Sequence, residues 1–403
     1  MRRRVKITGM GPVTPAGIGR EAFFRGINES VSRVRAITRF DPAAGPFIGA
    51  EVSGFDLKDY APEENAKRLS RHTQFGLAAA ILAMQDAGLA PHEAEKLNPT
   101  IVTGTSIMDI DKISRGVQIV AKKGARYSMP STIYEASSVN VPGKIAEYLG
   151  VPVRMFSLQS SCCSGLDAIG QAADLIATGQ SDFALTGGSE APLSFHPLLE
   201  FNAAELNPAN DELPAKSCRP FDLWRSTGVI GEGAAIFVLE PESSPRPALA
   251  WITGYGYAND PDIRAGSGLR ESMIQALANA CRRPDEVDYI NAWGPGHKQI
   301  DSHEAYAIKK LFGPELPEVP VTSIKGAVGT ALGASGAMQT ASTILSLIHG
   351  LLPPTLNWET PDPNCPLNLS TQLRRLHPRV AIINSHGLSG SNTTLVLEKA
   401  CPS

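Results

Sequence analysis

The stretch ITGMG at residues 7–11 returns as ITGYG at residues 252–256. After the first copy, the helical stretch AMQDAGL precedes the apolar run NPTIVTGT, and the stretch QALANACRRPDEVDYINAWG (275–294) repeats this helix-then-strand order after the second copy. The same order of elements at two places in one chain indicates an internal duplication. Two similar α/β halves would place two buried sheets between layers of helices.

The proline-rich link PESSPRP at 241–247 separates the two copies. We therefore expect an N-terminal half over residues 1–245 and a C-terminal half over residues 246–403. The long segment at about 106–150 is predicted to be an insertion that caps the first half. Short strands should alternate with helices in that half. The stretches predicted as strands are 5–11, 98–106, 182–191 and 234–240, and those predicted as helices are 20–27 and 71–89.

The composition of the 403 residues is that of a globular protein, with 42% apolar and 19% charged residues. A net charge of −3 does not favour nucleic acid as a partner. The basic start MRRR is followed by glycine and proline rather than a signal peptide, and no run of about 18 apolar residues predicts a membrane span. The six cysteines lack metal-type spacing. These features predict a cytoplasmic enzyme without a bound metal.

The stretch SSCCSGLDAIG at 160–170 places two cysteines before an amphipathic helix that should begin near residue 163. The strand-like run RMFSLQ leads into it, as in a nucleophile elbow. We expect Ser160 or Ser161 to cap the helix and the helix dipole to lower the thiol pKa below about 8.5. The free N–H groups of the first turn could bind a carbonyl oxygen. The alternative is a pair of buried, inert cysteines.

Seven ordered stretches together resemble the β-ketoacyl-acyl carrier protein synthases of the KAS I/II branch. They are RVKITGMGPVTPAG (4–17), SSCCSG (160–165), LTGGSEA (185–191), RPFD…GVIGEGAAIFVLE (219–240), YINAWGPG…D…E (289–304), TSIKGAVGTALGASGA (322–337) and NSHGLSGSN (384–392). The resemblance covers essentially the whole chain. It implies a thiolase-like, five-layer αβαβα sandwich made from two duplicated halves, and a homodimer.

The resemblance also implies which cysteine reacts. The family nucleophile is the third residue of T-A-C-x-[TS]-G, a position that Cys162 occupies, which leaves Cys163 as a packing residue. The N–H of Cys162 would be one oxyanion donor. The N–H of Leu388, in the glycine-rich turn, would be the second.

Two family positions depart from the pattern. Members that extend chains carry two histidines that stabilise an enolate as malonyl thioester loses CO₂. Trp293 stands at the first position, in NAWGPGHK, and Thr330 at the second, in SIKGAVGT. Neither side chain titrates near neutral pH. Decarboxylative condensation by the usual route is therefore not expected, although Lys325, Asp301 and Glu304 match the family's supporting charged residues.

Other predicted pocket residues come from the same motifs. Val229 stands where the family often has phenylalanine, and His386 and Leu388 replace two phenylalanines, the second an acyl gate. His196 and Phe201 belong to SFHPLLEF, which lines the acyl pocket in relatives. His386, His297 or His196 could substitute for a missing histidine, or each could be an ordinary core or surface side chain.

Two groups of basic residues could meet the acidic helix and phosphopantetheine arm of a carrier protein. They are Lys122, Lys123 and Arg126 in one group, and Lys67, Arg68 and Arg71 in the other. A solvated basic face is the alternative interpretation.

Three functions fit these observations. The first is an acyltransferase of fatty-acid-like or polyketide secondary metabolism. It would move an acyl group from a carrier protein or coenzyme A through Cys162 to a thiol, amine or hydroxyl, without a bound cofactor. The second is a chain-length-factor-like subunit that pairs with an active ketosynthase. The third is a condensing enzyme whose donors are Trp293 or His386.

Overall fold

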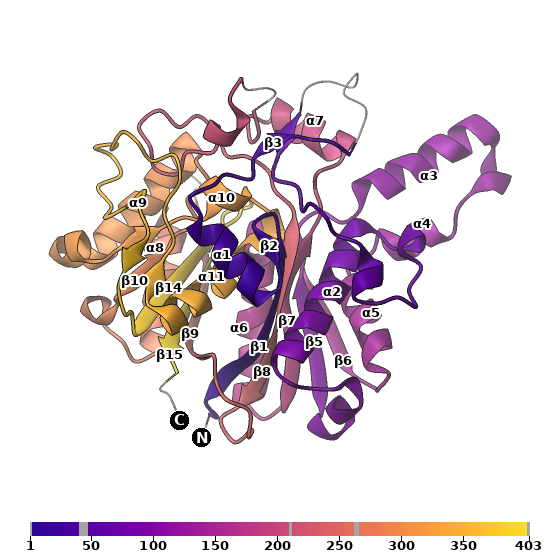
Figure 1. Cartoon of the computed structure of the whole chain (residues 1–403), viewed down its shortest axis with the longest axis horizontal. Coiled ribbons are helices and arrows are strands. Elements are labelled where there is room, and N and C mark those ends of the chain that lie inside the picture. The colour runs from indigo at the N-terminus through magenta and orange to yellow at the C-terminus, as the bar shows by residue number, and fades with distance from the viewer. Residues whose placement is uncertain (1, 40–46, 209–211, 262–265, 401–403) are drawn as a thin grey trace.

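The computed structural model describes residues 2–39, 47–208, 212–261 and 266–400. Within these ranges eleven strands form one mixed sheet (Figure 1). The strands are β1 (Val5–Thr14), β2 (Gly17–Ile18), β5 (Pro99–Gly104), β6 (Arg154–Leu158), β7 (Phe183–Glu190), β8 (Gly233–Pro241), β9 (Ala250–Asn259), β10 (Tyr289–Asn291), β11 (Val321–Thr322), β14 (Val380–His386) and β15 (Ser391–Lys399). Their order is β11-β10-β14-β15-β9-β1-β8-β7-β5-β6, with β2 paired to β1. Two small hairpins lie apart, β3 (Arg35–Ala36) with β4 (Ile48–Gly49) and β12 (Leu351–Leu352) with β13 (Arg374–Arg375).

The sheet consists of two matching halves that meet where β1 pairs with β9. Outward from this junction, β1, β8, β7, β5 and β6 make two antiparallel and then two parallel contacts. The strands β9, β15, β14, β10 and β11 repeat that pattern on the other side. The predicted α/β duplication is therefore confirmed, and the repeated ITG stretches lie in β1 and β9. The two expected sheets are joined edge to edge.

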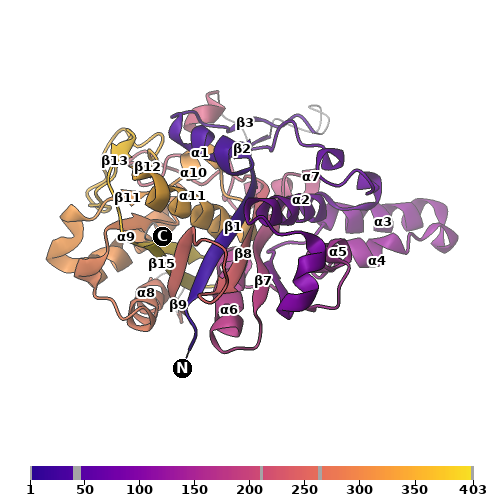
Figure 2. The same cartoon turned by 60° about the horizontal axis from the view of Figure 1, so that its bottom comes forward.

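Three layers of helices sandwich the two half-sheets (Figures 1 and 2). In the middle, α6 (Ser164–Ala177) packs on β5 and β7, α11 (Ser335–His349) packs on β14 and β15, and the two helices contact each other. On one outer face lie α2 (Arg71–Asp86) and α5 (Asn140–Leu149), and on the other lie α8 (Ser267–Asn279) and α9 (Lys298–Phe312). This is the five-layer αβαβα arrangement.

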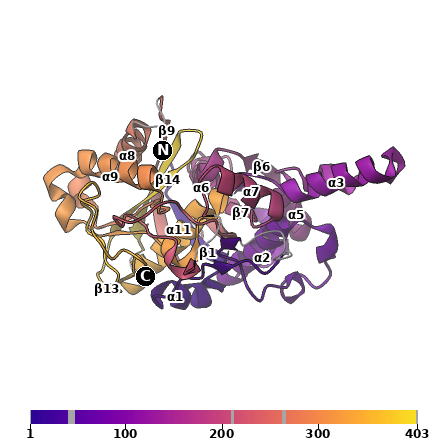
Figure 3. The ribbon, with the colours of Figure 1, turned by 90° about the horizontal axis from the view of Figure 1, so that it is seen from above.

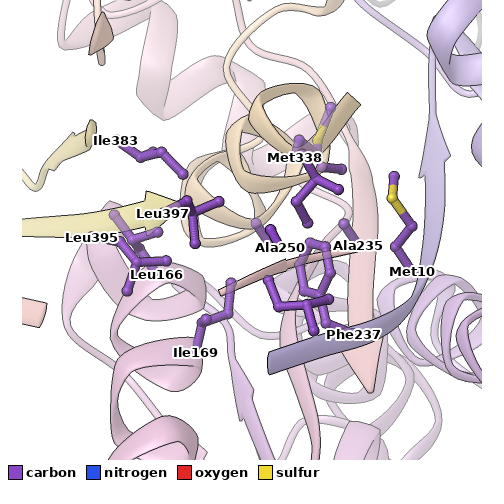
Figure 4. Packing of buried hydrophobic residues seen from close by; sticks show 14 of the residues in the cluster. Met10, Leu166, Ile169, Ala235, Phe237, Ala250, Met338, Ile383, Leu395 and Leu397 are labelled. Carbon is purple, nitrogen blue, oxygen red and sulfur yellow. The ribbon is translucent and has the colours of Figure 1, made fainter. Parts of the chain in front are cut away.

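The middle layer is closed by aliphatic side chains from both halves. Figure 4 shows Leu166 and Ile169 of α6 close to Phe237, Leu395 and Leu397 of the sheet. Burial of each such side chain contributes about 1.5–3 kcal/mol to folding. The N-terminus of α6, which carries the cysteine pair, is therefore held by packing from both halves.

Helix α2 forms because its sequence is rich in alanine and leucine, which are strong helix formers. It ends where Gly88 adopts φ of +63°, the left-handed conformation that glycine tolerates without a Cβ clash. The predicted helix over 71–89 with a glycine stop is confirmed, and it ends three residues before the end of the predicted stretch. Its buried alanines let it lie close to β1 and β8.

The segment predicted as a cap divides into two parts. Helices α3 (Ile110–Lys123) and α4 (Ser131–Glu135) form an arm that projects from the body in all three views (Figures 1–3). Helix α5 packs on α2, β5 and β6 instead. It occupies the place in the first half that α9 has in the second, between two parallel strands.

The remaining helices are short. They are α1 (Arg20–Asn28), α7 (Phe195–Ala203) and α10 (Lys325–Val328). No helix within the described ranges has the length and apolar character that a membrane crossing requires.

Candidate active site

Cys162 lies on a strained turn between β6 and α6. Residues 161–163 form a single 3₁₀ turn, and α6 begins at Ser164. Ser161 has φ of +58°, a region that residues other than glycine rarely adopt. A strand that feeds such a turn and then a helix is the geometry of a nucleophile elbow. The turn lifts the cysteine out of the regular helix and toward a cavity.

The predicted serine cap of α6 is wrong. Neither Ser160 nor Ser161 caps the helix with its side chain. The Ser160 hydroxyl donates instead to the buried carboxylate of Asp167, which also accepts from Tyr255 and Thr393. Asp167 competes for this hydroxyl because a buried carboxylate must satisfy its oxygens with hydrogen-bond donors.

A small, mostly apolar cavity of about 40 Å³ opens beside Cys162. Both halves of the chain contribute to its wall, which excludes water from most of the surface around the sulfur. The lining residues are Cys162, Phe201, Leu206, Gly228, Ile230, Trp293, Pro295, His297, Ile300, Thr330, Leu332, His386 and Leu388.

The thiol of Cys162 is not acidified in the resting protein. Burial and the nearby Glu190 carboxylate raise its pKa to about 11, although a hydrogen bond from the Leu388 N–H and the charge of Lys325 oppose this shift. The pKa lowering expected from the helix terminus is therefore corrected. The physical reason is that Cys162 is only 5% exposed, and burial disfavours the thiolate more than the helix dipole favours it.

The glycine-rich turn between β14 and β15 is fastened to the cysteine turn. The Ser385 hydroxyl donates to the carbonyl of Cys162 at 3.2 Å, and the Ser391 hydroxyl donates to the carbonyl of Ser160 at 2.9 Å. The Leu388 N–H lies close enough to the Cys162 sulfur to lower the pKa of the thiol. A carbonyl carbon attached to this sulfur would place its oxygen close to the same donor.

Cys163 points away from the cavity. It is fully buried, and its Sγ donates to the Ser391 carbonyl at 3.4 Å. The environment of Cys163 is that of a packing residue.

Trp293 and Thr330 both lie on the cavity wall. The Thr330 main-chain N–H donates to the Val229 carbonyl at 2.7 Å, which fixes the backbone of this position. Its hydroxyl is buried and has no hydrogen-bond partner among the described residues. A buried, unpaired hydroxyl can donate to a substrate oxygen in the cavity.

Lys325 and Glu304 lie behind the tryptophan, not on the cavity wall as predicted. The Lys325 Nζ lies 4.5 Å from the centre of the Trp293 ring and donates to Gln339 Oε1 at 2.9 Å. Burial lowers the pKa of Lys325 to about 7. Glu304 accepts from the N–H groups of Trp293 and Gly294, each at 2.8 Å. These two side chains hold the loop that carries Trp293, since Glu304 accepts from its N–H groups and Lys325 lies over its ring.

Asp301 supports the neighbouring loop. Its carboxylate accepts from the N–H groups of Phe221 at 2.7 Å and Gly296 at 3.1 Å, and Arg225 lies 3.6 Å away. Burial raises the pKa of Asp301 to about 7. Arg225, which is fully buried between Asp301 and Asp362, was not singled out from the sequence because its partners are 76 and 137 residues away.

Of the other residues predicted to line the pocket, one does and two do not. Phe201 lines the cavity. Val229 is fully buried in a separate cluster, and His196 is exposed on α7 with its ring near Phe195. The pocket positions predicted for Val229 and His196 are thus corrected. Along α7 the side chain of Phe201 faces inward while that of His196, five residues earlier, faces solvent.

The two remaining histidines both reach the cavity. His386 Nδ1 lies 2.8 Å from Asn392 Oδ1. His297 Nδ1 accepts the main-chain N–H of Ile300 at 3.4 Å, as the cap of α9. Burial lowers the pKa of His297, which is therefore neutral at physiological pH.

The predicted docking cations do not form one surface. Arg71 is partly buried, and it and Arg39 both pair with the fully buried Glu232. Its assignment as a free docking cation is corrected, because a buried carboxylate requires such partners. Lys67 and Arg68 are exposed on a 3₁₀ turn at the base of the arm, where Lys112 donates to the Arg68 carbonyl.

Lys122, Lys123 and Arg126 are exposed at the tip of the arm. Lys123 and Arg126 flank the ring of Tyr127 at 5.9 and 4.9 Å. Lys112 and Lys122 are ten residues apart along α3, a distance of about 15 Å along the helix axis. The tip and the base of the arm therefore carry two separate groups of basic side chains.

No cluster that could hold a metal ion occurs among the described side chains.

Comparison with known proteins places the chain among relatives of one kind. Residues 2–244 match the family model "Beta-ketoacyl synthase, N-terminal domain", and residues 249–359 match "Beta-ketoacyl synthase, C-terminal domain". The tetracenomycin polyketide synthase ketoacyl synthase alpha subunit of Streptomyces glaucescens is 32% identical over 98% of this chain and 97% of its own. A 3-oxoacyl-[acyl-carrier-protein] synthase 2 of Coxiella burnetii is 33% identical over 99% of both chains.

The similarity extends to solved structures. The ishigamide ketosynthase/chain length factor superposes with a TM-score of 0.93 at 28% identity over the full length of both chains. The thiolase-like fold expected from the motifs is confirmed.

Proposed function

Because the chain belongs to the β-ketoacyl synthase family, we propose that it transfers an acyl group from the thioester of a carrier protein or coenzyme A, through Cys162, to an acceptor thiol, amine or hydroxyl. The observation that carries the proposal is the cavity itself. It contains a cysteine and an oxyanion donor, Leu388, but Trp293 and Thr330 at the two histidine positions.

Thioester exchange needs only what this cavity contains. The Cys162 thiol gives its proton to a base, and the sulfur attacks the thioester carbonyl. The new carbon–sulfur bond forms as the bond to the carrier thiol breaks, and that thiol leaves with the proton. The Leu388 N–H stabilises the oxyanion in between. The apolar wall strengthens this hydrogen bond by excluding water.

Decarboxylation of a malonyl thioester would need more. By the family resemblance its enolate is stabilised by two histidine imidazoles, whereas Trp293 and Thr330 offer only an indole N–H and a hydroxyl at those positions, neither of which titrates near neutral pH. Loss of one positioned donor typically costs about 10²–10³ in rate. We therefore propose acyl transfer without decarboxylative condensation.

The carrier thioester would enter with its phosphopantetheine arm toward the cavity, and no cofactor bound to the protein takes part. The exposed cations Lys67 and Arg68 at the base of the arm are the docking residues that we propose for an acyl carrier protein. Lys122, Lys123 and Arg126 would form a second contact at the tip. The name of the Coxiella relative includes an acyl carrier protein, which supports a carrier protein as the partner.

A second subunit is expected at the end of the sheet. β6 is the last strand, and it exposes Met155 and Phe156 by 44% and 42%. Val139 adds exposed apolar surface beside it, since Ser157 of β6 is hydrogen-bonded to the Ser138 carbonyl, and Ile133 and Tyr134 of the preceding helix α4 are also exposed. An apolar edge of this kind is normally covered. We propose a homodimer through this edge, which we call the β6 face (Ile133, Tyr134, Val139, Met155 and Phe156).

The test is the mass of the intact protein after incubation with acyl-carrier and malonyl-carrier thioesters. We expect an acyl adduct on Cys162 that disappears in Cys162→Ala, and no release of CO₂ from the malonyl thioester. Absence of the adduct, or an adduct that persists in Cys162→Ala, would reject the transferase. Release of CO₂ would favour the condensing enzyme, with Trp293 or His386 as donors.

A chain-length-factor-like role is the second candidate, favoured by the similarity to the ishigamide ketosynthase/chain length factor and by the open β6 face. In that case the chain would pair with an active ketosynthase as a heterodimer. Co-purification distinguishes the two. A stable homodimer with acylated Cys162 supports the transferase, and obligate pairing without acylation supports the second candidate.

A further inference from the structure

The ring of His386 is held by a chain of hydrogen bonds that fixes the position of its proton. His386, the last residue of β14, lies directly opposite Asn392 of β15, and its Nδ1 is 2.8 Å from Asn392 Oδ1. This distance alone does not show which of the two residues donates the proton. The hydrogen bonds of the Asn392 side chain identify the donor.

The side-chain amide of Asn392 has only one orientation that satisfies its neighbours. Its Nδ2 donates to Asp260 Oδ2 at 2.8 Å and to the Gly390 carbonyl at 3.0 Å, both of which are acceptors. The Oδ1 atom is thereby an acceptor toward His386. Since an amide oxygen cannot donate, the proton of this hydrogen bond belongs to His386 Nδ1.

The position of Asp260 is itself fixed by hydrogen bonds. Its Oδ1 accepts the N–H of Gly268 at 2.6 Å and the hydroxyl of Ser267 at 3.3 Å. Its own N–H donates to the Gly390 carbonyl at 2.7 Å. Asp260 and Asn392 are 7% and 1% exposed, so water does not compete for this chain of bonds.

His297, the other histidine that lines the cavity, is held in the opposite tautomer. Its Nδ1 accepts the N–H of Ile300, so in the neutral ring the proton is on Nε2. Both histidines line the cavity, and in their neutral rings His297 carries its proton on Nε2 and His386 on Nδ1.

His386 shares its cavity with the nucleophile. Ser385 and Leu388, which flank His386 in sequence, contact the carbonyl and the sulfur of Cys162, and His386 and Cys162 line the same cavity. The thiol is protonated at rest and must lose its proton when it attacks. Lys325 does not line the cavity, and its Nζ is hydrogen-bonded to Gln339 and lies over the Trp293 ring.

We propose that Asp260 and Asn392 are positioning residues that hold His386 with its proton on Nδ1, so that Nε2 is the base of the acyl transfer. This rests on the proposed function. In the first step Nε2 takes the Cys162 proton and returns it to the departing carrier thiol. In the second step Nε2 takes the proton of the acceptor as its oxygen or nitrogen attacks the acyl carbon, and the proton passes to the released Sγ. A base of this kind is needed by a hydroxyl or amine acceptor, which we infer to be the acceptor class.

The first test reads the tautomer in the wild-type protein, without substrate. In spectra of ¹⁵N-ring-labelled histidine at pH 8, the signals lost in His386→Ala should show a protonated Nδ1 and a bare Nε2. Those lost in His297→Ala should show the reverse. A protonated Nε2 on His386 would overturn the proposal even if Cys162 is acylated, so failure here is distinct from failure of the proposed function.

The second test measures the rate of Cys162 acylation. His386→Ala should slow it by about 100-fold, with partial rescue by added imidazole. Asn392→Ala and Asp260→Asn should each slow it by about tenfold and move the His386 signals toward a mixture of tautomers. His92→Ala, at an exposed site, is the control. Unchanged acylation in His386→Ala would also overturn the proposal.

Discussion

At the scale of single residues, Cys162 is placed as a nucleophile, but its thiol is not acidic. Cys162 has the position of a nucleophile, but burial and Glu190 keep it a thiol. The fraction of thiolate at pH 7 is about 10⁻⁴ for a pKa near 11. A substrate must therefore meet both the sulfur and a base. This is consistent with protection of the thiol against oxidation, which also proceeds through the thiolate.

Alkylation of Cys162 by iodoacetamide tests this state. Because the folded pKa is raised, the thiolate is scarce at neutral pH and increases until the pH passes the folded value. We expect the rate at the Cys162 peptide to rise about tenfold per pH unit from pH 7 to pH 10. Cys162→Ala identifies the peptide. A rate that is already level at pH 7 would mean a resting thiolate and contradict the expectation.

At the scale of elements, the nucleophile turn depends on the close approach of the two halves. Gly165 in the first turn of α6 lies against Gly333 of the other half and Gly188 of β7. A Cβ at Gly165 would lie 2.5 Å from the Gly333 carbonyl oxygen, closer than any real contact. The glycine is thus required for close packing of backbone on backbone.

Gly165→Ala should destabilise the protein by about 1–3 kcal/mol and slow Cys162 acylation, since the turn must shift. The matched control is Gly143→Ala in α5, where a Cβ meets nothing within 4 Å. That variant should gain about 0.5–1 kcal/mol, because alanine is the better helix former. Both are measured by urea denaturation. Equal stability of the two variants would contradict the packing argument.

At the scale of the whole molecule, the duplicated fold creates the cavity between the halves and leaves the sheet open at β6. The cavity wall needs Cys162 from one half and Trp293, Thr330 and His386 from the other. The β6 face exposes apolar side chains at the opposite end from β11. The same architecture thus supplies both a site and a surface for a second subunit.

Phe156→Arg should convert the proposed dimer into a monomer, because a charged side chain opposes burial of the β6 face. Sedimentation of the wild type at micromolar concentration should give twice the mass of the variant. Tyr306→Arg, at an exposed ring on α9, is the control and should remain dimeric. A monomeric wild type, or a dimeric Phe156→Arg, would remove this interface.

The α/β class, the duplication and the placing of a cysteine at a strand-to-helix turn were all available from the sequence. Repeated motifs and local periodicity report these features directly. The long-range charge pairs were not available. Arg71 was predicted to be a docking cation, but it pairs with Glu232, 161 residues away.

The protonation of the site was likewise decided only by the tertiary structure. The cysteine motif predicted an acidic thiol, because a helix terminus is local and visible in sequence. Burial between two halves, the carboxylate of Glu190 and the chain from His386 through Asn392 to Asp260 are not local. Electrostatic free energy depends on distance in space and on access to water, and both are set only when residues far apart in the chain pack together.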